Sequence, residues 1–99
     1  MDPKLEQYIE DYRHKISALL MDTDEDHPIE CEIPLGEDYS CGLSTLDMPW
    51  IVKCYQEPGG GIMYFYTDGN YWVEFDEIDV RDYYNIYNAL IEYHEKNNK

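Results

Sequence analysis

Carboxylates are the main chemistry-bearing groups of this chain, and long stretches carry them without a neighbouring base. The 99 residues include 22 Asp and Glu against seven Lys and Arg, for a formal net charge of −15. No base occurs from Ile16 to Val52, where nine acids lie, or from Cys54 to Val80, where six lie. Self-repulsion of this size destabilises a compact state. The charge therefore indicates a second requirement, either solubility or a positively charged partner.

The spacing of the acids suits a partner that normally holds nucleic acid. Carboxylates at alternate positions of a strand share one face about 6.6 Å apart, and rows of Lys and Arg that hold a phosphate backbone could pair with them. We interpret the acids as a surface that imitates nucleic-acid phosphates. The alternative is a solvated face that serves solubility. The predicted acidic contact residues are Asp22, Asp24, Glu25, Asp26, Glu30, Glu32, Glu37, Asp38, Glu74, Asp76, Glu77, Asp79 and Asp82.

Three aromatic residues complete the predicted partner-binding surface, namely Tyr39, Phe65 and Trp72, and Tyr55 is a further candidate for an exposed binding patch. Charge raises association rate more than affinity, so exposed rings are expected to supply the binding energy. Eleven Tyr, two Trp and two Phe are too many for a disordered acidic tail. They alternate with acids, whereas binding of single-stranded nucleic acid requires aromatics beside bases. We therefore expect a folded domain that does not bind nucleic acid directly.

Catalytic and metal-binding patterns are not met. The acids at 22, 24 and 26 match the start of an EF-hand calcium loop, but His27 and Ile33 stand where that loop needs Gly and Glu. The glycines at 59–61 lack the Lys and Ser or Thr of a phosphate-binding loop. We expect no enzymatic activity, no cofactor and no metal ion.

The cysteines and the N-terminus bear on the cellular compartment. The three cysteines form no C-x-x-C pair and are predicted to be free thiols; they are Cys31, Cys41 and Cys54. The charged N-terminus lacks the apolar stretch of a signal peptide, and no run of 18 apolar residues could span a membrane. The expectation is a cytoplasmic protein without membrane contact.

The acids and rings must be positioned by elements that the sequence also predicts. Asp2 as N-cap and Pro3 at the first helical position begin a helix. It should end near Met21, because four carboxylates at 22–26 oppose the helix dipole. Its apolar stripe, at spacings of three and four, is Leu5, Tyr8, Ile9, Tyr12, Ile16, Leu19 and Leu20.

Period-two alternation predicts the strands. Residues 29–35 form one, at a sheet edge because Pro34 cannot donate a ladder hydrogen bond, and residues 50–56 form another. A loop at 36–49 and a turn at 57–61 flank the second strand. Residues 62–67 and 71–76 flank Asp68-Gly69, a signal for a type I′ hairpin.

A two-residue hairpin turn fixes the predicted register. The face assigned to the core pairs Tyr66 with Tyr71, Tyr64 with Val73, and Ile62 with Phe75. The other, partly exposed face pairs Phe65 with Trp72, and Met63 with Glu74.

A final helix, capped by Asp76 or Asp79, runs to about Glu95. Its predicted apolar face is Val80, Tyr83, Tyr84, Tyr87, Leu90, Ile91 and His94. The fold class is therefore α+β: one small domain over residues 1–99, with an N-terminal helix, a three- to four-stranded antiparallel sheet and a C-terminal helix.

In size, acidity and lack of catalytic residues the whole chain resembles the phage-encoded DNA-mimic inhibitors, anti-CRISPR proteins among them. The resemblance is one of physical character and carries over no residue roles. It implies a non-enzymatic inhibitor that blocks the basic nucleic-acid-binding site of another protein. Two alternatives are an immunity protein or antitoxin that neutralises a cationic nuclease toxin, and an interaction module whose charge serves only solubility.

Overall fold

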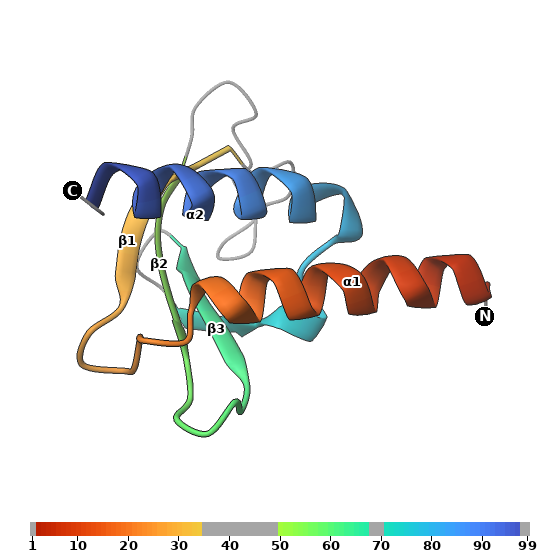
Figure 1. Cartoon of the computed structure of the whole chain (residues 1–99), viewed down its shortest axis with the longest axis horizontal. Coiled ribbons are helices and arrows are strands. Elements are labelled where there is room, and N and C mark those ends of the chain that lie inside the picture. Colours follow the sequence, from red (N-terminus) through yellow and green to blue (C-terminus); the bar gives the residue numbers. More distant parts are fainter. Residues whose placement is uncertain (1, 35–49, 68–70, 98–99) are drawn as a thin grey trace.

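Two helices cover one face of a four-stranded antiparallel sheet (Figure 1). The computed structural model describes residues 2–34, 50–67 and 71–97. The elements in chain order are α1 (Pro3–Leu19), β1 (Ile29–Ile33), β2 (Trp50–Gln56), β3 (Met63–Thr67), β4 (Tyr71–Glu74), the 3-10 turns η1 (Phe75–Glu77) and η2 (Val80–Asp82), and α2 (Tyr83–Asn97). The sheet order is β1-β2-β3-β4. The predicted α+β fold is confirmed.

Local signals place both ends of α1. The Asp2 carboxylate accepts a hydrogen bond from the backbone N–H of Lys4 at 3.0 Å, as an N-cap should. The helix ends at Leu19, close to the predicted Met21, and the acidic turn at 22–26 follows it.

The helices α1 and α2 run in the same direction. Tyr8 lies 6.2 Å from Tyr83 and Tyr12 lies 6.0 Å from Tyr87, both measured between ring centroids. Farther along, the His94 ring Nε2 is 2.7 Å from the Leu19 carbonyl oxygen. The residue numbers of the contacting pairs increase along both helices, so the two helices are parallel.

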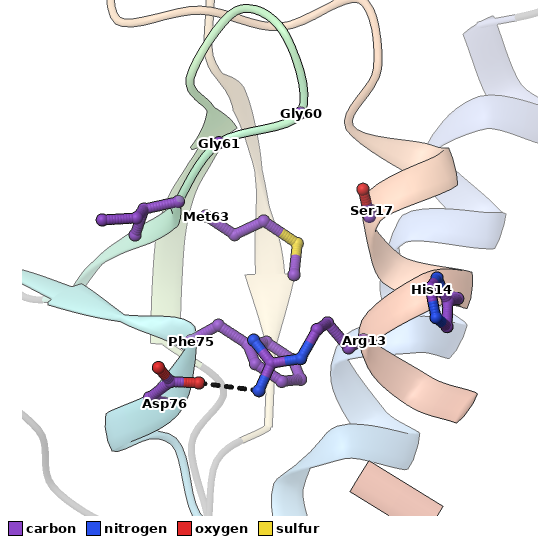
Figure 2. Close-up of a pocket in the computed structure, with 9 residues that line it drawn as sticks. Arg13, His14, Ser17, Gly60, Gly61, Met63, Phe75 and Asp76 are labelled. Carbon is purple, nitrogen blue, oxygen red and sulfur yellow. Dashed lines mark hydrogen bonds and ion pairs between the residues drawn. The ribbon is translucent and has the colours of Figure 1, made fainter. Parts of the chain in front are cut away.

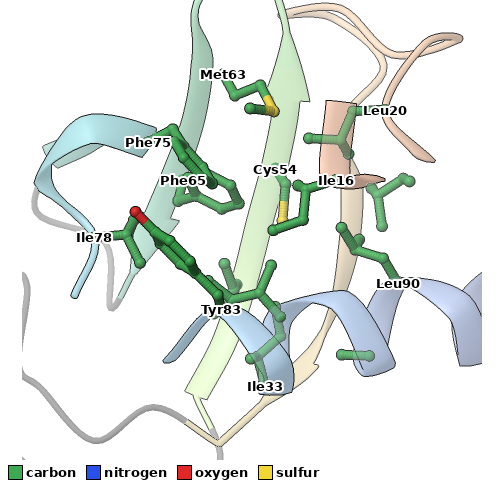
Figure 3. Close-up of a cluster of buried hydrophobic side chains, with 14 of the residues drawn as sticks. Ile16, Leu20, Ile33, Cys54, Met63, Phe65, Phe75, Ile78, Tyr83 and Leu90 are labelled. Carbon is green, nitrogen blue, oxygen red and sulfur yellow. The ribbon is translucent and has the colours of Figure 1, made fainter. Parts of the chain in front are cut away.

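The core lies between the helices and the inner face of the sheet (Figure 3). Ile16 and Leu20 from the N-terminal part of the chain, and Ile86 and Leu90 from α2, are at most 1 % exposed. The predicted apolar face of the last helix was wrong at Tyr84, which is 59 % exposed. The full core is Ile16, Leu20, Ile29, Ile33, Val52, Cys54, Met63, Phe65, Val73, Phe75, Ile78, Tyr83, Ile86, Ala89 and Leu90.

The register of β3 with β4 differs from the predicted one by one residue. Phe65 pairs with Val73 and Thr67 pairs with Tyr71, so that residues 68–70 separate the last pair. A shift of one residue moves each side chain of a strand to the opposite face. The predicted faces of β3 were therefore wrong, whereas Val73 and Phe75 are buried as expected. The predicted Asp68-Gly69 turn lies outside the described residues.

The remaining boundaries lie within a few residues of the predicted ones. β1 is an edge strand, as Pro34 indicated, and it ends at Ile33. β4 ends at Glu74, because η1 and η2 intervene before α2. Asp79 caps η2 by accepting from the backbone N–H of Arg81 at 2.8 Å.

Candidate protein-binding face

The outer face of the sheet, turned away from both helices, carries most of the features that could bind a partner. Side chains alternate between the two faces of a strand, and the inner positions are those of the core. The described outer positions are Glu30 and Glu32 of β1, Lys53 and Tyr55 of β2, Tyr64 and Tyr66 of β3, and Trp72 and Glu74 of β4. We refer to these residues as the outer face.

Four rings on the outer face form one cluster, the aromatic patch, made of Tyr55, Tyr64, Tyr66 and Trp72. Tyr55 and Tyr64 are register partners on β2 and β3, and their rings stack at 5.2 Å. Trp72 reaches across β3, with its ring 4.7 Å from Tyr66 and edge-on at 5.0 Å from Tyr55. This packing leaves Tyr55 only 9 % exposed, while the other three rings are half-buried. The patch is therefore held in place before any partner arrives.

Three carboxylates, those of Glu25, Glu57 and Glu74, lie close to the aromatic patch. Burial raises the pKa of Tyr55, and the charge of Glu25 raises it further, followed by Tyr64 and Glu57. Burial also raises the pKa of Tyr64, with additional contributions from Glu57 and Glu74. A neighbouring carboxylate raises a phenol pKa because it disfavours the phenolate. The patch thus consists of neutral rings with negative charge at their rim.

Three of the described bases pair with carboxylates within the chain. The Arg13 guanidinium lies 2.8 Å from an Asp76 carboxylate oxygen, and the Arg81 guanidinium lies 2.9 Å from Asp79. Lys53, the only base among the described outer-face residues, has its Nζ 3.9 Å from Glu30. These contacts leave the outer face with an excess of negative charge.

The predicted contact residues Phe65 and Asp82 are buried in the fold, and Tyr55, expected to be exposed, is buried within the aromatic patch. These findings correct the sequence-based prediction. Phe65 is 1 % exposed, because the observed register turns it into the core, where its ring lies 6.4 Å from Phe75. Asp82 is 2 % exposed at the junction of η2 and α2. In their place, the register brings Tyr64 and Tyr66 to the outer face beside Trp72. The predicted register assigned these two tyrosines to the core, because the pattern of β3 does not show which of its faces is buried; only the observed register does.

The predicted acids do not form a single surface. Glu30, Glu32 and Glu74 lie on the outer face, and Glu25 is close enough to influence Tyr55. The other described acids are exposed or partly exposed at the acidic turn and around η1 and η2; they are Asp22, Asp24, Asp26, Asp76, Glu77 and Asp79. Three predicted residues, Glu37, Asp38 and Tyr39, lie outside the described residues. A role in partner binding stays a prediction for all of these residues.

Several of these acids also have structural roles. One Asp24 carboxylate oxygen accepts from the backbone N–H groups of Asp26 and His27, at 2.9 and 2.8 Å, and so closes the acidic turn. The His27 hydrogen bonds and charge lower the Asp24 pKa. Asp76 holds Arg13, and Asp79 holds Arg81. Neutralising Asp24, Asp76 or Asp79 would perturb the fold together with the surface charge. Glu25, Glu30 and Glu32 are the cleaner sites for variants, because all three are exposed and the contact of Glu30 with Lys53, at 3.9 Å, lies within the outer face itself.

A cleft of about 330 Å³ lies between α1 and the turn that precedes β3 (Figure 2). Arg13, Ser17, Met63 and Asp76 contribute to its lining. Its polar groups already have partners: Arg13 is paired with Asp76, and the Ser17 hydroxyl donates to the Gln56 side-chain oxygen at 2.6 Å. This arrangement positions no nucleophile with a base, and we assign the cleft no function. Across residues 2–34, 50–67 and 71–97, no three His, Cys, Asp or Glu side chains gather closely enough to hold a metal ion.

No protein-family model, curated protein or solved structure matches this chain. Within the part of the chain that the structure describes, neither helix has the length and apolar character needed to cross a bilayer. The candidate site accordingly rests on the geometry and charge of the outer face itself.

Proposed function

We propose that this chain is a non-enzymatic binding protein whose outer face covers the basic nucleic-acid-binding site of another protein and blocks it. One observation carries the proposal. The outer face combines a pre-packed aromatic patch with nearby carboxylates, and its single described base, Lys53, lies 3.9 Å from Glu30. A face that served solubility alone would not need half-buried rings at its centre.

The two parts of the face have different physical roles. The carboxylates would steer a cationic partner and raise its association rate. The rings would supply the desolvated contact that determines how long the complex persists. Glu30 and Glu32 occupy alternate positions of the edge strand β1, which puts their Cα atoms about 6.6 Å apart. Basic side chains arranged to follow a phosphate backbone could engage such a row.

The test compares two variants with equal net charge. The outer-face variant combines Glu25→Gln, Glu30→Gln and Glu32→Gln, and the control combines Glu6→Gln, Asp11→Asn and Glu95→Gln on the helices. All six side chains are exposed, and each variant changes the formal charge from −15 to −12. Each immobilised protein is used to capture partners from host lysate at low and moderate salt, and bound protein is eluted with added DNA or RNA.

We expect the wild type and the control to retain a basic nucleic-acid-binding protein that nucleic acid elutes, and the outer-face variant to lose most of it. Equal capture by all three proteins would contradict the proposal. Capture of a partner that neither salt nor nucleic acid releases would also contradict it and would favour an interaction module whose charge serves solubility.

A further inference from the structure

The chain contains its own example of how it holds a guanidinium group. The central carbon of Arg13 lies 4.9 Å from the centroid of the Phe75 ring. Its Nη2 is 2.8 Å from Asp76 and its Nε is 3.2 Å from Glu10. One ring face and two carboxylates therefore bind one arginine from three sides. Figure 2 shows Arg13 beside Phe75, with the ion pair to Asp76 drawn as a dashed line.

The outer face offers the same groups in larger number. It presents four rings, with Glu25, Glu57 and Glu74 close enough to raise the pKa of Tyr55 or Tyr64. At one end, the Lys53 ammonium already lies between Glu30, at 3.9 Å, and the Tyr66 ring centroid, at 6.0 Å. Both distances are longer than those of Arg13, so this end of the patch attracts a cation without enclosing it.

Resting on the proposed function, we propose that the aromatic patch binds arginine side chains of the partner, and that the partner surface facing it is rich in arginine rather than lysine. A guanidinium is planar and weakly hydrated, so it stacks on an aromatic ring while its N–H groups reach neighbouring carboxylates. An ammonium is compact and strongly hydrated, and it loses more on leaving water. The negative charge of the rim favours a cation, and the rings favour a guanidinium over an ammonium group.

The test uses two synthetic probes of equal length and charge, hexa-arginine and hexa-lysine peptides, with the full chain. Binding is measured by calorimetry at low salt, and the Trp72 indole N–H resonance is followed by NMR. That resonance is assigned from the spectrum of Trp72→Leu. We expect the arginine peptide to bind about fivefold more tightly, a ratio that corresponds to about 1 kcal/mol of cation–π stabilisation. It should also shift the Trp72 resonance more than the lysine peptide does.

Matched variants show whether the rings cause the preference. Trp72→Leu should bring the two affinities to within twofold, whereas Tyr84→Leu, at an exposed ring on α2, should leave the fivefold ratio intact. Lys53→Met frees the end of the patch and should raise affinity for the arginine peptide more than Lys4→Met, which changes the charge equally on α1. Unchanged far-ultraviolet circular dichroism confirms that each variant is folded, and Tyr64→Leu replaces Trp72→Leu if the latter does not fold.

The outcomes separate this inference from the proposed function. Equal affinity of the two peptides overturns the arginine assignment. A preference that survives Trp72→Leu, or Tyr64→Leu where it is used instead, also overturns it. If the Glu25, Glu30 and Glu32 variant still fails to capture the nucleic-acid-binding protein in that case, the proposed function stands. Failure of the wild type to bind either peptide at low salt would count against the proposed function as well.

Discussion

The register of β3 decides which aromatic rings face a partner, and two single substitutions test it. Phe65 is 1 % exposed and packs against Phe75, whereas its chain neighbour Tyr64 is half-buried on the outer face. Phe65→Ala removes a fully buried ring and should lower the free energy of unfolding by about 3–5 kcal/mol. Tyr64→Ala loses part of one ring contact and some apolar burial, and should cost about 1 kcal/mol.

The free energies of unfolding are measured by urea denaturation followed by circular dichroism. A loss of about 3–5 kcal/mol is a large part of the total of about 5–15 kcal/mol that is typical of a domain. We therefore expect Phe65→Ala to leave little folded protein to measure. Phe65→Leu and Tyr64→Leu provide a gentler pair, for which we expect losses of about 1 kcal/mol and close to zero. A loss for Tyr64 that equals or exceeds the loss for Phe65 in the same pair would refute the observed register. The outer face would then carry Phe65 in place of Tyr64 and Tyr66.

Three further predictions concern the charge, an acidic cap and the thiols. Raising sodium chloride from about 10 mM to 1 M shortens the Debye length from about 30 to 3 Å, so thermal unfolding should shift to higher temperature; a lower midpoint at high salt would contradict the self-repulsion argument. The Arg81 side chain, as hydrogen-bond donor, lowers the pKa of Asp79 from 3.8 to about 2. The stability from this cap is therefore present above the unfolded-state pKa and is lost as the pH falls towards 2. Asp79→Ala should cost about 1 kcal/mol at pH 7 after allowance for solvent screening, measured by urea denaturation, and a cost that is the same at pH 7 and pH 2 would contradict this account. Burial raises the pKa of Cys31 to about 11, with Glu30 and Glu92 adding to it, and also raises the pKa of Cys54. Iodoacetamide at pH 8 should therefore modify both thiols much more slowly in the native chain than in urea, as followed by mass spectrometry. Equal rates of modification would contradict the burial of the two thiols.

Elements with local signals could be predicted from the sequence. Asp2 and Pro3 mark the start of α1 without reference to the rest of the chain. The apolar stripe identified its inner side at Ile16, which is buried, whereas Leu5 and Tyr8 of the same stripe are exposed. Pro34 indicated an edge strand for a similar local reason, because a residue without an N–H cannot donate a ladder hydrogen bond. β1 lies at the edge of the sheet and ends at the residue before Pro34.

The register and the aromatic patch could not be predicted in the same way. In β3 both faces are apolar, with Met63 and Phe65 on one side and Tyr64 and Tyr66 on the other, so alternation gives no preference. Packing in the core determines which face of β3 is buried, because Phe65 packs against Phe75 beneath the helices. The proximity of Glu25 to Tyr55 likewise depends on how the acidic turn returns to the sheet.

Displacement of nucleic acid tests the central claim most directly. The partner captured by the wild type is purified and bound to a fluorescently labelled oligonucleotide, and anisotropy is followed as this protein is added. We predict a fall to the value of the free oligonucleotide near one equivalent of protein, with the Glu25, Glu30 and Glu32 variant requiring a large excess and the matched helix variant behaving as wild type. An anisotropy that stays at the value of the complex, or rises because this protein adds to it, would contradict the account. The outer face would then bind somewhere other than the nucleic-acid site.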